Sequence, residues 1–255
     1  MKELRKTIIT TAARAGEGHI PSALSIIDII WVLYDRVLRY NAADPKWQHR
    51  DRFVLSKGHG CLALYSVLAA KGFYDLTELE SFGRAGSRFG GHPDCNKVPG
   101  VEASTGSLGH GLPIAVGMAL GLKIRGNQER VFVLIGDGEC NEGTIWESAL
   151  LGHYRRLGNL TCIVDYNHSS DRALGLGDLR AKFEAFGWST REIDGHDHDQ
   201  IYDALGCHRE LEGSPMAIIA NTIKGNGCAQ MRNNPAWHHR APTPDELASI
   251  LMEVL

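Results

Sequence analysis

Two short segments of this 255-residue chain combine oxygen ligands and glycines in a pattern suited to binding an ion and a phosphate. The segment Gly136-Asp137-Gly138 follows the apolar run 131–135, and Asn167 follows the apolar run 160–165. Both runs are predicted to be buried strands of a parallel sheet that are connected through a helix. The two segments would then lie at the carboxyl ends of their strands, where open α/β sheets bind ligands.

The chemistry open to these residues is the binding of a divalent cation and a phosphate group. The carboxylate of Asp137, the amide oxygen of Asn167 and a nearby backbone carbonyl are hard oxygen ligands of the kind that Mg²⁺ and Ca²⁺ prefer. Gly136 and Gly138 allow the backbone to come close to a phosphate, and the amides that open the next helix can donate to it. The alternative is a tight strand-to-helix turn without a ligand. The spacing and the two flanking strands favour the binding site.

Five histidines stand beside or within three residues of a glycine or proline, in segments predicted to be loops or their edges. They are His19, His59, His92, His110 and His239. One such histidine usually has a structural or surface role, but all five would fall near the ends of strands or helices. Neutral imidazole can accept or donate a proton near pH 7, and its cation can hold a phosphate. The series therefore favours a functional site over five unrelated surface residues.

Apolar residues recur with helical or strand spacing along the chain. The predicted helices cover residues 2–15, 21–39, 61–72, 108–124, 143–157 and 199–211, and a last helix starts at the capping sequence Thr243-Pro244-Asp245-Glu246. The predicted strands cover residues 52–56, 131–135, 160–165, 188–193 and 216–220. The alternation predicts one α/β domain over residues 1–255, with a doubly wound, mostly parallel sheet and helices on both faces. The long glycine-rich loop 81–107 is expected to carry function, and two further loops of this kind cover residues 168–177 and 224–242.

Composition excludes several classes of protein. A formal charge of −3 and the lack of a Lys/Arg-rich run argue against a general nucleic-acid binder. The six cysteines show no paired short spacing, which suits a reducing cytosol better than a disulfide framework or a zinc site. The charged N-terminus and the absence of a long apolar run predict a cytoplasmic protein without a membrane span.

The histidine segments, in their order around the Gly136-Asp137-Gly138 and Asn167 pair, resemble the N-terminal diphosphate-binding domain of transketolase, a thiamine diphosphate enzyme. The resemblance runs from Thr10 to Glu246, and it includes the segments 194–197 and 222–227. Other thiamine diphosphate enzymes share the Gly-Asp-Gly motif without this histidine series, so the whole set is more specific than the motif. The resemblance implies the thiamine diphosphate-binding fold.

The resemblance also implies roles for single residues. Mg²⁺ or Ca²⁺ would be bound by Asp137, Asn167 and the backbone carbonyl of Ser169. Thiamine diphosphate would contact His59, Gly106, Ser107, Leu108, Gly136, Gly138, Glu139, Asn167 and His239. His19, His92 and His239 would line the substrate channel and exchange protons with hydroxyl groups. Glu142, together with Glu147, would belong to a carboxylate network across a subunit interface.

Two departures from the family pattern stand out. The loop 168–172 reads His-Ser-Ser-Asp-Arg, and Asp171 falls where the family commonly has an apolar residue near the cofactor ring. A carboxylate there would be costly to bury unless it is paired, for which Arg172 is a candidate, and this bears on the assignment of Ser169. In addition, the segment 18–21 reads Gly-His-Ile-Pro instead of the commoner Gly-His-Pro-Gly.

A full transketolase chain also has a pyrimidine-binding domain, which supplies the glutamate that starts cofactor activation, and a C-terminal domain. Nothing in this chain resembles either, and the capped last helix favours a natural end. The resemblance thus implies the N-terminal subunit of a split transketolase. With a separate C-terminal subunit it would form an α2β2 assembly and transfer a two-carbon ketol unit from a ketose to an aldose, as sugars or sugar phosphates.

Three alternatives remain at this point. A split acyloin-forming enzyme stays open because of the Asp171 loop. The α subunit of a 2-oxo acid dehydrogenase is disfavoured by the histidine series. A non-catalytic binding subunit is disfavoured because Asp137 and Asn167 are both present.

Overall fold

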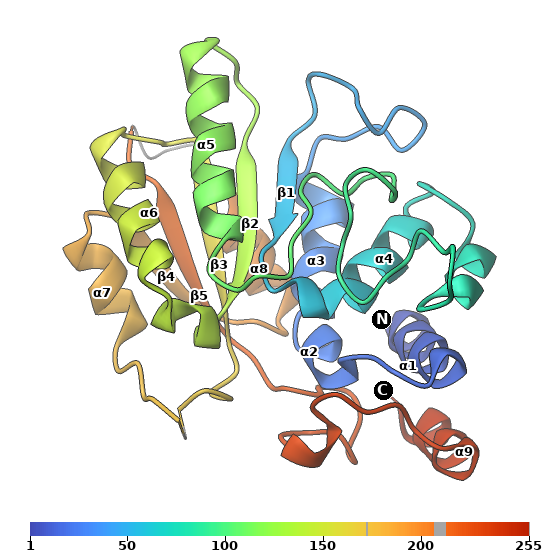
Figure 1. The fold of residues 1–255 in the computed structure, drawn as a ribbon. Helices are drawn as coiled ribbons and strands as arrows, with labels where there is room; N and C mark the ends of the chain where they lie inside the picture. The colour runs from blue at the N-terminus through green and yellow to red at the C-terminus, as the bar shows by residue number, and fades with distance from the viewer. Residues whose placement is uncertain (172, 207–212, 255) are drawn as a thin grey trace.

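A five-stranded sheet forms the centre of the computed structural model, which describes residues 1–171, 173–206 and 213–254. Its strands are β1 (Arg52–Leu55), β2 (Val131–Gly136), β3 (Leu160–Tyr166), β4 (Ser189–Asp194) and β5 (Met216–Asn221). They lie in the order β1-β2-β3-β5-β4, and every neighbouring pair is parallel (Figure 1). The predicted parallel α/β sheet is confirmed.

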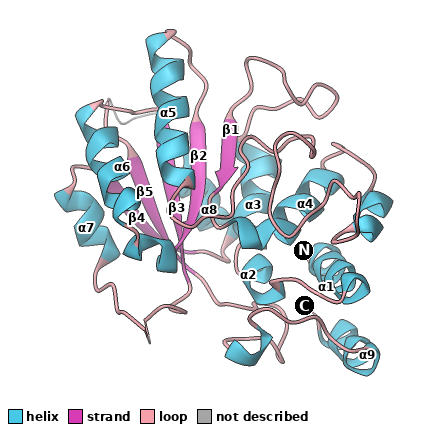
Figure 2. Ribbon diagram, viewed as in Figure 1, coloured by secondary structure: helices cyan, strands magenta, loops and turns pink. Residues whose placement is uncertain are grey.

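Helices cover both faces of the sheet, as predicted (Figure 2). On one face lie α1 (Lys2–Ala15), α2 (Ile20–Leu24), α3 (Ile27–Val32), α4 (Cys61–Ala70) and α8 (His198–Gly206), with α9 (Pro244–Glu253) packed on α1. On the other lie α5 (Gly111–Ile124), α6 (Gly143–Tyr154) and α7 (Leu179–Ala185). The strands serve both cores because successive side chains alternate: Phe132 packs in the first and Val133 in the second.

The single helix predicted over residues 21–39 is wrong. The segment is divided into α2, α3 and a short π-helical stretch, Leu33–Val37. Ser25 stands at the first division, where its hydroxyl donates to the carboxylate of Asp165 at 2.8 Å. At this interruption a polar side chain of the segment contacts a buried carboxylate near the carboxyl end of β3. The helical periodicity of the sequence did not reveal this contact.

One helix was not predicted, and several predicted helix ends differ by a few residues. The helices predicted over 61–72, 108–124 and 143–157 are α4, α5 and α6, with the shorter bounds given above. Helix α7 was not predicted, because it is short and only Leu179 and Phe183 are buried in it; Asp178 caps it by accepting from the Ala181 amide at 2.9 Å. The helix predicted over 199–211 is α8, which ends at Gly206, and the remainder of that range lies outside the described residues. Within the described residues, no helix is both long and apolar enough to cross a membrane.

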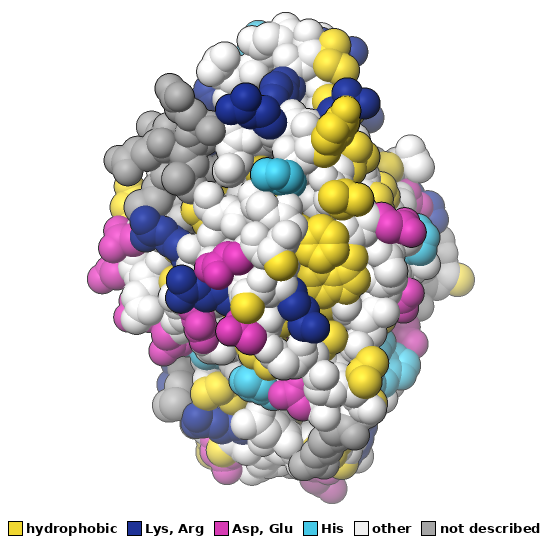
Figure 3. Space-filling view, turned by 90° about the vertical axis from the view of Figure 1, so that its left-hand side faces the viewer, with side chains coloured by type: hydrophobic (Ala, Val, Ile, Leu, Met, Phe, Trp, Pro, Cys, Tyr) yellow, Lys and Arg dark blue, Asp and Glu magenta, His cyan; other side chains and the backbone are white. Residues whose placement is uncertain are grey.

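The outer sides of α5 and α6 carry large hydrophobic side chains at the surface. Figure 3 views this side of the molecule and shows hydrophobic side chains among the charged ones. We define the α5/α6 apolar face by its exposed members, which are Ile114, Ile124, Leu150, Leu151 and Tyr154. Exposed hydrophobic side chains gathered on neighbouring helices are typical of a surface that another chain covers.

Candidate functional site

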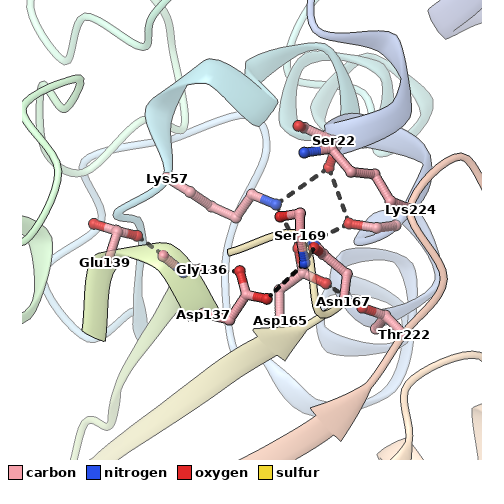
Figure 4. A network of polar contacts seen from close by, with 12 residues as sticks. Ser22, Lys57, Gly136, Asp137, Glu139, Asp165, Asn167, Ser169, Thr222 and Lys224 are labelled. Carbon is pink, nitrogen blue, oxygen red and sulfur yellow. Dashed lines mark hydrogen bonds and ion pairs between the residues drawn. The ribbon is translucent and has the colours of Figure 1, made fainter. Parts of the chain in front are cut away.

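The carboxyl ends of β2 and β3 bring Asp137, Asn167 and the backbone amide of Ser169 together (Figure 4), while the role of the Ser169 carbonyl as a metal ligand stays a prediction. Asp137 follows β2 directly and Asn167 follows β3. The backbone amide of Ser169 donates to Asp137 Oδ2 and to Asn167 Oδ1, both at 3.1 Å. Burial raises the pKa of Asp137, and the nearby charge of Asp165 raises it further. A cation at this point would therefore stabilise the ionised form of Asp137.

The buried ion pair between Lys57 and Asp165 orients the side chain of Asn167. Asp165 is fully buried; it is paired with the ammonium of Lys57 and accepts from the hydroxyl groups of Ser25 and Thr222. Burial alone would raise the pKa of Asp165, but the charge of Lys57 and the hydrogen bonds from Lys57, Thr222 and Ser25 together outweigh it, and the pKa is lowered. The amide nitrogen of Asn167 donates to the same carboxylate at 2.9 Å. The amide oxygen of Asn167 is consequently fixed toward Asp137, in the way that outer hydrogen-bond partners orient a metal ligand.

Glu139 connects three segments around the site. Its Oε1 accepts from the Ser56 hydroxyl at 2.6 Å and from the Gly109 amide at 2.8 Å, and its Oε2 accepts from the Gly136 amide at 2.9 Å. Burial raises the pKa of this carboxyl group. The predicted cofactor contact of Glu139 stays a prediction, because here its two oxygens are engaged by the chain itself. In the structure, Glu139 connects the ends of β1 and β2 with the loop before α5 and so helps to position all three.

That loop carries Gly106, Ser107 and Leu108, the predicted contacts of the aminopyrimidine ring. It lies against the end of β1: the Thr105 hydroxyl donates to the Leu55 carbonyl at 2.6 Å. It also lies against His92, since a Cβ added at Gly106 would be 3.1 Å from the His92 ring. Leu108 is partly exposed at 39%. The loop is thus held beside the metal-ligand cluster with an apolar side chain at the surface.

Four of the five predicted histidines gather at one cavity of about 180 Å³. His19, His59, His92 and His239 line it, together with Glu17. The ring centroids of His19 and His239 are 4.4 Å apart, and those of His19 and His59 are 5.1 Å apart. His110 does not join them; it is exposed at the start of α5, where its Nδ1 contacts the Leu108 carbonyl at 3.1 Å.

The surroundings of two of these imidazoles favour their neutral form. Burial, helped by the neighbouring histidines, lowers the pKa of His19 to about 4. Burial and the charge of Lys57 lower the pKa of His59 to about 2. The predicted contact of His59 with the diphosphate stays a prediction.

A second cavity, of about 410 Å³, opens beside Asn167 and Ser169. Its opposite side is formed by the segment after β5 and by the third glycine-rich loop, including Thr222, Lys224, Asn233, Asn234 and His238. Sequence reasoning missed Lys57, Asp165, Lys224 and His238. The available signal was a charged residue next to the end of a buried strand, which holds for Lys57 after β1, for Asp165 within β3 and for Lys224 after β5.

The Asp171 departure is resolved differently from the expectation. Asp171 is exposed, and its carboxylate is paired with His168 Nδ1 at 2.8 Å, so the expected cost of burial does not arise. The suggested partner, Arg172, lies outside the described residues. Glu142 and Glu147 are exposed at the start and in the middle of α6, and their network across a subunit interface stays a prediction.

The space around Gly138 suits a phosphate group. Gly138 does not have a positive φ, and a Cβ added there would meet only Ser170 Cβ, at an ordinary 3.8 Å. A Cβ added at Gly136 would likewise come no closer than 3.7 Å to Lys57. Among the described residues, the hydroxyl of Ser170 is buried without a hydrogen-bond partner. The folded chain therefore does not require these glycines, whereas a ligand lying against their backbone would.

Comparison with known proteins gives one consistent family. The family described as "Transketolase, thiamine diphosphate binding domain" matches residues 1–253. The chain is 36% identical over 256 residues to the 6-deoxy-6-sulfo-D-fructose transketolase subunit SqwG of a Clostridium species, covering 98% of this chain and 93% of that protein. It is 37% identical over 258 residues to an apulose-4-phosphate transketolase subunit of Phocaeicola vulgatus, covering 98% of this chain and 90% of that protein.

Solved structures agree. The transketolase of Campylobacter jejuni superposes with a TM-score of 0.90 and 33% identity, over 98% of this chain. This chain spans only 41% of that longer protein, whereas it spans nearly the whole length of the two relatives from Clostridium and Phocaeicola.

Proposed function

The chain belongs to the transketolase thiamine diphosphate-binding family, and we propose a role for each part of its site in the reaction of a split transketolase. It is the N-terminal, thiamine diphosphate-binding subunit of such an enzyme. The observation that carries the proposal is the convergence of Asp137 Oδ2 and Asn167 Oδ1 on one backbone amide, that of Ser169. Two oxygen ligands from adjacent strand ends meet there next to glycines that the protein interior does not explain.

Asp137, Asn167 and the carbonyl of Ser169 would hold Mg²⁺ or Ca²⁺, whose positive charge would help to bind the diphosphate. Gly136, Gly138 and His59 would border the diphosphate, while Gly106, Ser107 and Leu108 would contact the aminopyrimidine. When bound, thiamine diphosphate supplies the electron sink needed to break and form a carbon–carbon bond next to a carbonyl group.

The histidine cavity would receive the sugar. His19, His92 and His239 line it and would hold or transfer protons at sugar hydroxyl groups. Because the pKa of His19 is lowered to about 4, this residue takes part as a neutral imidazole, which accepts a hydrogen bond at one ring nitrogen and donates at the other. Glu142 would act from the start of α6, at the interface with another subunit.

We infer that the partner is a separate C-terminal transketolase subunit and that the assembly is α2β2, since closed twofold symmetry is the commonest arrangement. The reaction would be the transfer of a two-carbon ketol unit from a ketose to an aldose. Two of the relatives are named for ketoses that carry a sulfo or a phosphate group. Ketoses with an anionic terminal group are therefore the donors to assay first.

The binding of cofactor and metal tests the proposal directly. Asp137→Ala removes the one charged side chain among the proposed protein ligands of the metal, and the affinity for thiamine diphosphate should fall by at least about tenfold. Calorimetric titration with Mg²⁺ measures this change, and chelator should weaken binding to the wild-type chain as strongly. Asp203→Ala, which removes an exposed carboxylate on α8, is the matched control and should bind as the wild type does. Equal affinity in Asp137→Ala and the wild type would refute the metal assignment.

A further inference from the structure

We propose that Arg240 is a positioning residue, which holds His239 at the histidine cavity by bridging Trp237 and Glu246. This inference rests on the proposed function, in which His239 lines the sugar channel. It extends that function to a side chain that is not among those lining the cavity.

The segment that carries His239 receives no support from backbone hydrogen bonds. Before it, the His238 amide donates to the Pro235 carbonyl at 3.1 Å, and after it, the Thr243 amide donates to Glu246 Oε2 at 2.9 Å. Between these two bonds, the backbone of residues 239–242 forms no hydrogen bond with any other described residue. Side chains must therefore fix the course of this segment.

Arg240 supplies such a connection from within the segment. Its guanidinium carbon lies 4.2 Å from the centroid of the Trp237 ring, and that ring is buried. Its Nη2 donates to both carboxylate oxygens of Glu246, at 2.5 Å for Oε2. A guanidinium can make both contacts because its flat face stacks on an aromatic ring while its edge donates hydrogen bonds. One side chain thus joins the buried residue before the segment to the helix after it.

The far end of this bridge is fixed as well. Glu246 belongs to the capping box of α9: its amide donates to the Thr243 hydroxyl at 3.3 Å, and its Oε2 accepts from the Thr243 amide. Helix α9 packs on α1 and buries Ile250 in the core. The carboxylate that Arg240 contacts is therefore attached to the body of the domain.

His239 depends on this bridge because its own ring has few contacts. The ring centroid lies 4.4 Å from that of His19 at the cavity, but among the described residues the His239 ring forms no hydrogen bond. Arg240 is the next residue in the chain, and Trp237 precedes His239 by two positions. Fixing both restricts where the His239 ring can lie.

The bridge is expected to act on position more than on overall stability. The side chains of Arg240 and Glu246 are 39% and 33% exposed, and ion pairs that solvent reaches contribute little to the stability of a fold. Thermal melting of Arg240→Met should therefore resemble that of the wild type, while the histidine cavity changes.

NMR titration of the histidine rings in the ligand-free chain measures this change. Burial lowers the pKa of His19 to about 4, and the charge of His239 is the next cause. If Arg240→Met releases His239, both effects weaken, so the pKa of His19 should rise by about 1 or more toward its ordinary value of 6.5. The signal of His19 is assigned by its loss in His19→Ala.

Two further variants make this titration decisive. Glu246→Gln removes the charge that Arg240 contacts but keeps an oxygen for the cap of α9, and it should also raise the pKa of His19. Arg180→Met is the matched control, since it removes an arginine from an exposed ion pair on α7, with Glu184 at 2.9 Å; the pKa of His19 should stay near 4. The inference is overturned if that pKa stays near 4 in Arg240→Met, or in Glu246→Gln should Arg240→Met fail to fold.

Kinetics of the chain reconstituted with a C-terminal subunit connect the position of His239 to the reaction. With a ketose phosphate as donor, Arg240→Met should lower kcat/KM by about 10- to 100-fold, the effect of a misplaced reacting group. It should cause no further loss in a His239→Ala background, because Arg240 acts through His239. A full additional loss there would overturn the role. If the wild-type complex converts no ketose, the proposed function fails, and the titration of His19 still decides the assignment of Arg240.

Discussion

Gly138 has an identity that the folded chain itself does not explain. Its backbone does not have a positive φ, and a methyl group there would find ordinary contact distances. Gly109 is the opposite case: its φ is 83°, and a Cβ would be 2.6 Å from Glu142 Cβ. The fold therefore requires glycine at position 109, whereas at position 138 a ligand close to the backbone would explain the glycine.

We expect Gly138→Ala to keep the thermal stability of the wild-type chain but to weaken thiamine diphosphate binding by about tenfold or more, which is the effect of about 1.4 kcal/mol. Gly109→Ala should lower the free energy of unfolding by at least about 1 kcal/mol, because the strained backbone and the overlap with Glu142 both act on the folded state. Thermal melts with and without cofactor measure both effects, since a ligand that binds the native state raises its melting temperature. A destabilised Gly138→Ala with normal cofactor affinity would contradict the assignment.

The sequence was sufficient to identify the side chains that follow strands and carry familiar chemistry. Asp137, Asn167 and four of the histidines were predicted, and the structure brings them to one end of the sheet. The sequence was insufficient for Asp165 and Lys57, because a buried ion pair depends on two strands being neighbours in space. It also did not indicate that the carboxylate of Asp171 is exposed and paired with His168, three residues earlier in the same turn.

At the scale of elements, a buried charged cluster joins three parts of the fold. Asp28 of α3 accepts from Arg5 of α1 at 2.6 Å, and its two oxygens contact His196 at 2.9 Å and His198 at 3.2 Å, at the β4–α8 connection. His196 Nε2 in turn accepts from the Ile223 amide at 2.9 Å, close to the segment that bears Lys224. The cluster thereby links the packing of the helices to the position of one wall of the site.

We expect Asp28→Asn to lower the free energy of unfolding by about 3–5 kcal/mol at neutral pH, because it leaves the buried guanidinium of Arg5 without a counter-charge. Burial alone would raise the pKa of Asp28, but the hydrogen bond from His196 and the charge of Arg5 lower it below 3.8. A carboxyl group whose pKa is lower in the folded state than in the unfolded state stabilises the fold at pH values above its unfolded-state pKa. This contribution is therefore complete above about pH 5 and is lost as the pH falls through the native pKa.

Denaturant unfolding of both proteins between pH 3 and pH 7 measures the difference, which should shrink only at the acidic end. A difference that stays constant down to the lowest pH would show that the charge of Asp28 is not its source. Asp199→Asn is a suitable control: its carboxylate forms an exposed pair with Arg36 at 3.2 Å, and such pairs contribute at most about 1 kcal/mol.

The elements themselves were largely predictable, for physical reasons that also explain the errors. The apolar runs 131–135 and 160–165 are buried on both faces, so they could only be central strands. Helix α1 ends next to Gly16, as predicted. Gly16 has a left-handed φ of 76°, and its amide donates to the carbonyls of Ala12 and Ala13 at the end of the helix. The division between α2 and α3 was not predicted, because both pieces are apolar and their periodicity does not reveal that Ser25, at the division, donates to the distant carboxylate of Asp165.

At the scale of the whole molecule, the site lies at the carboxyl ends of the central strands, and its cavities open to the surface. In the proposed function, the glutamate that activates the cofactor comes from a second chain, which then has to approach this edge. The α5/α6 apolar face begins near it: α5 follows the loop that carries Leu108, and α6 follows the segment that carries Gly138. A C-terminal subunit that completes the site would cover part of this face.

We therefore expect the purified chain to bind thiamine diphosphate but to show no transketolase activity until a separate C-terminal subunit is added. Light scattering of the mixture should give the mass of two copies of each chain. The double variant Ile114→Lys and Leu150→Lys places two charges on the α5/α6 apolar face and should abolish the complex and the activity. Cofactor affinity of the variant chain should be unchanged, since neither side chain is part of the proposed cofactor site.

Met252→Lys is the control for this experiment, because Met252 is an equally apolar, 81% exposed side chain on α9, away from α5 and α6. It should assemble and react as the wild type does. Activity of the isolated chain would refute the requirement for a partner. Normal assembly of the double variant would place the interface elsewhere, because two desolvated, unpaired lysines would cost a buried interface several kcal/mol.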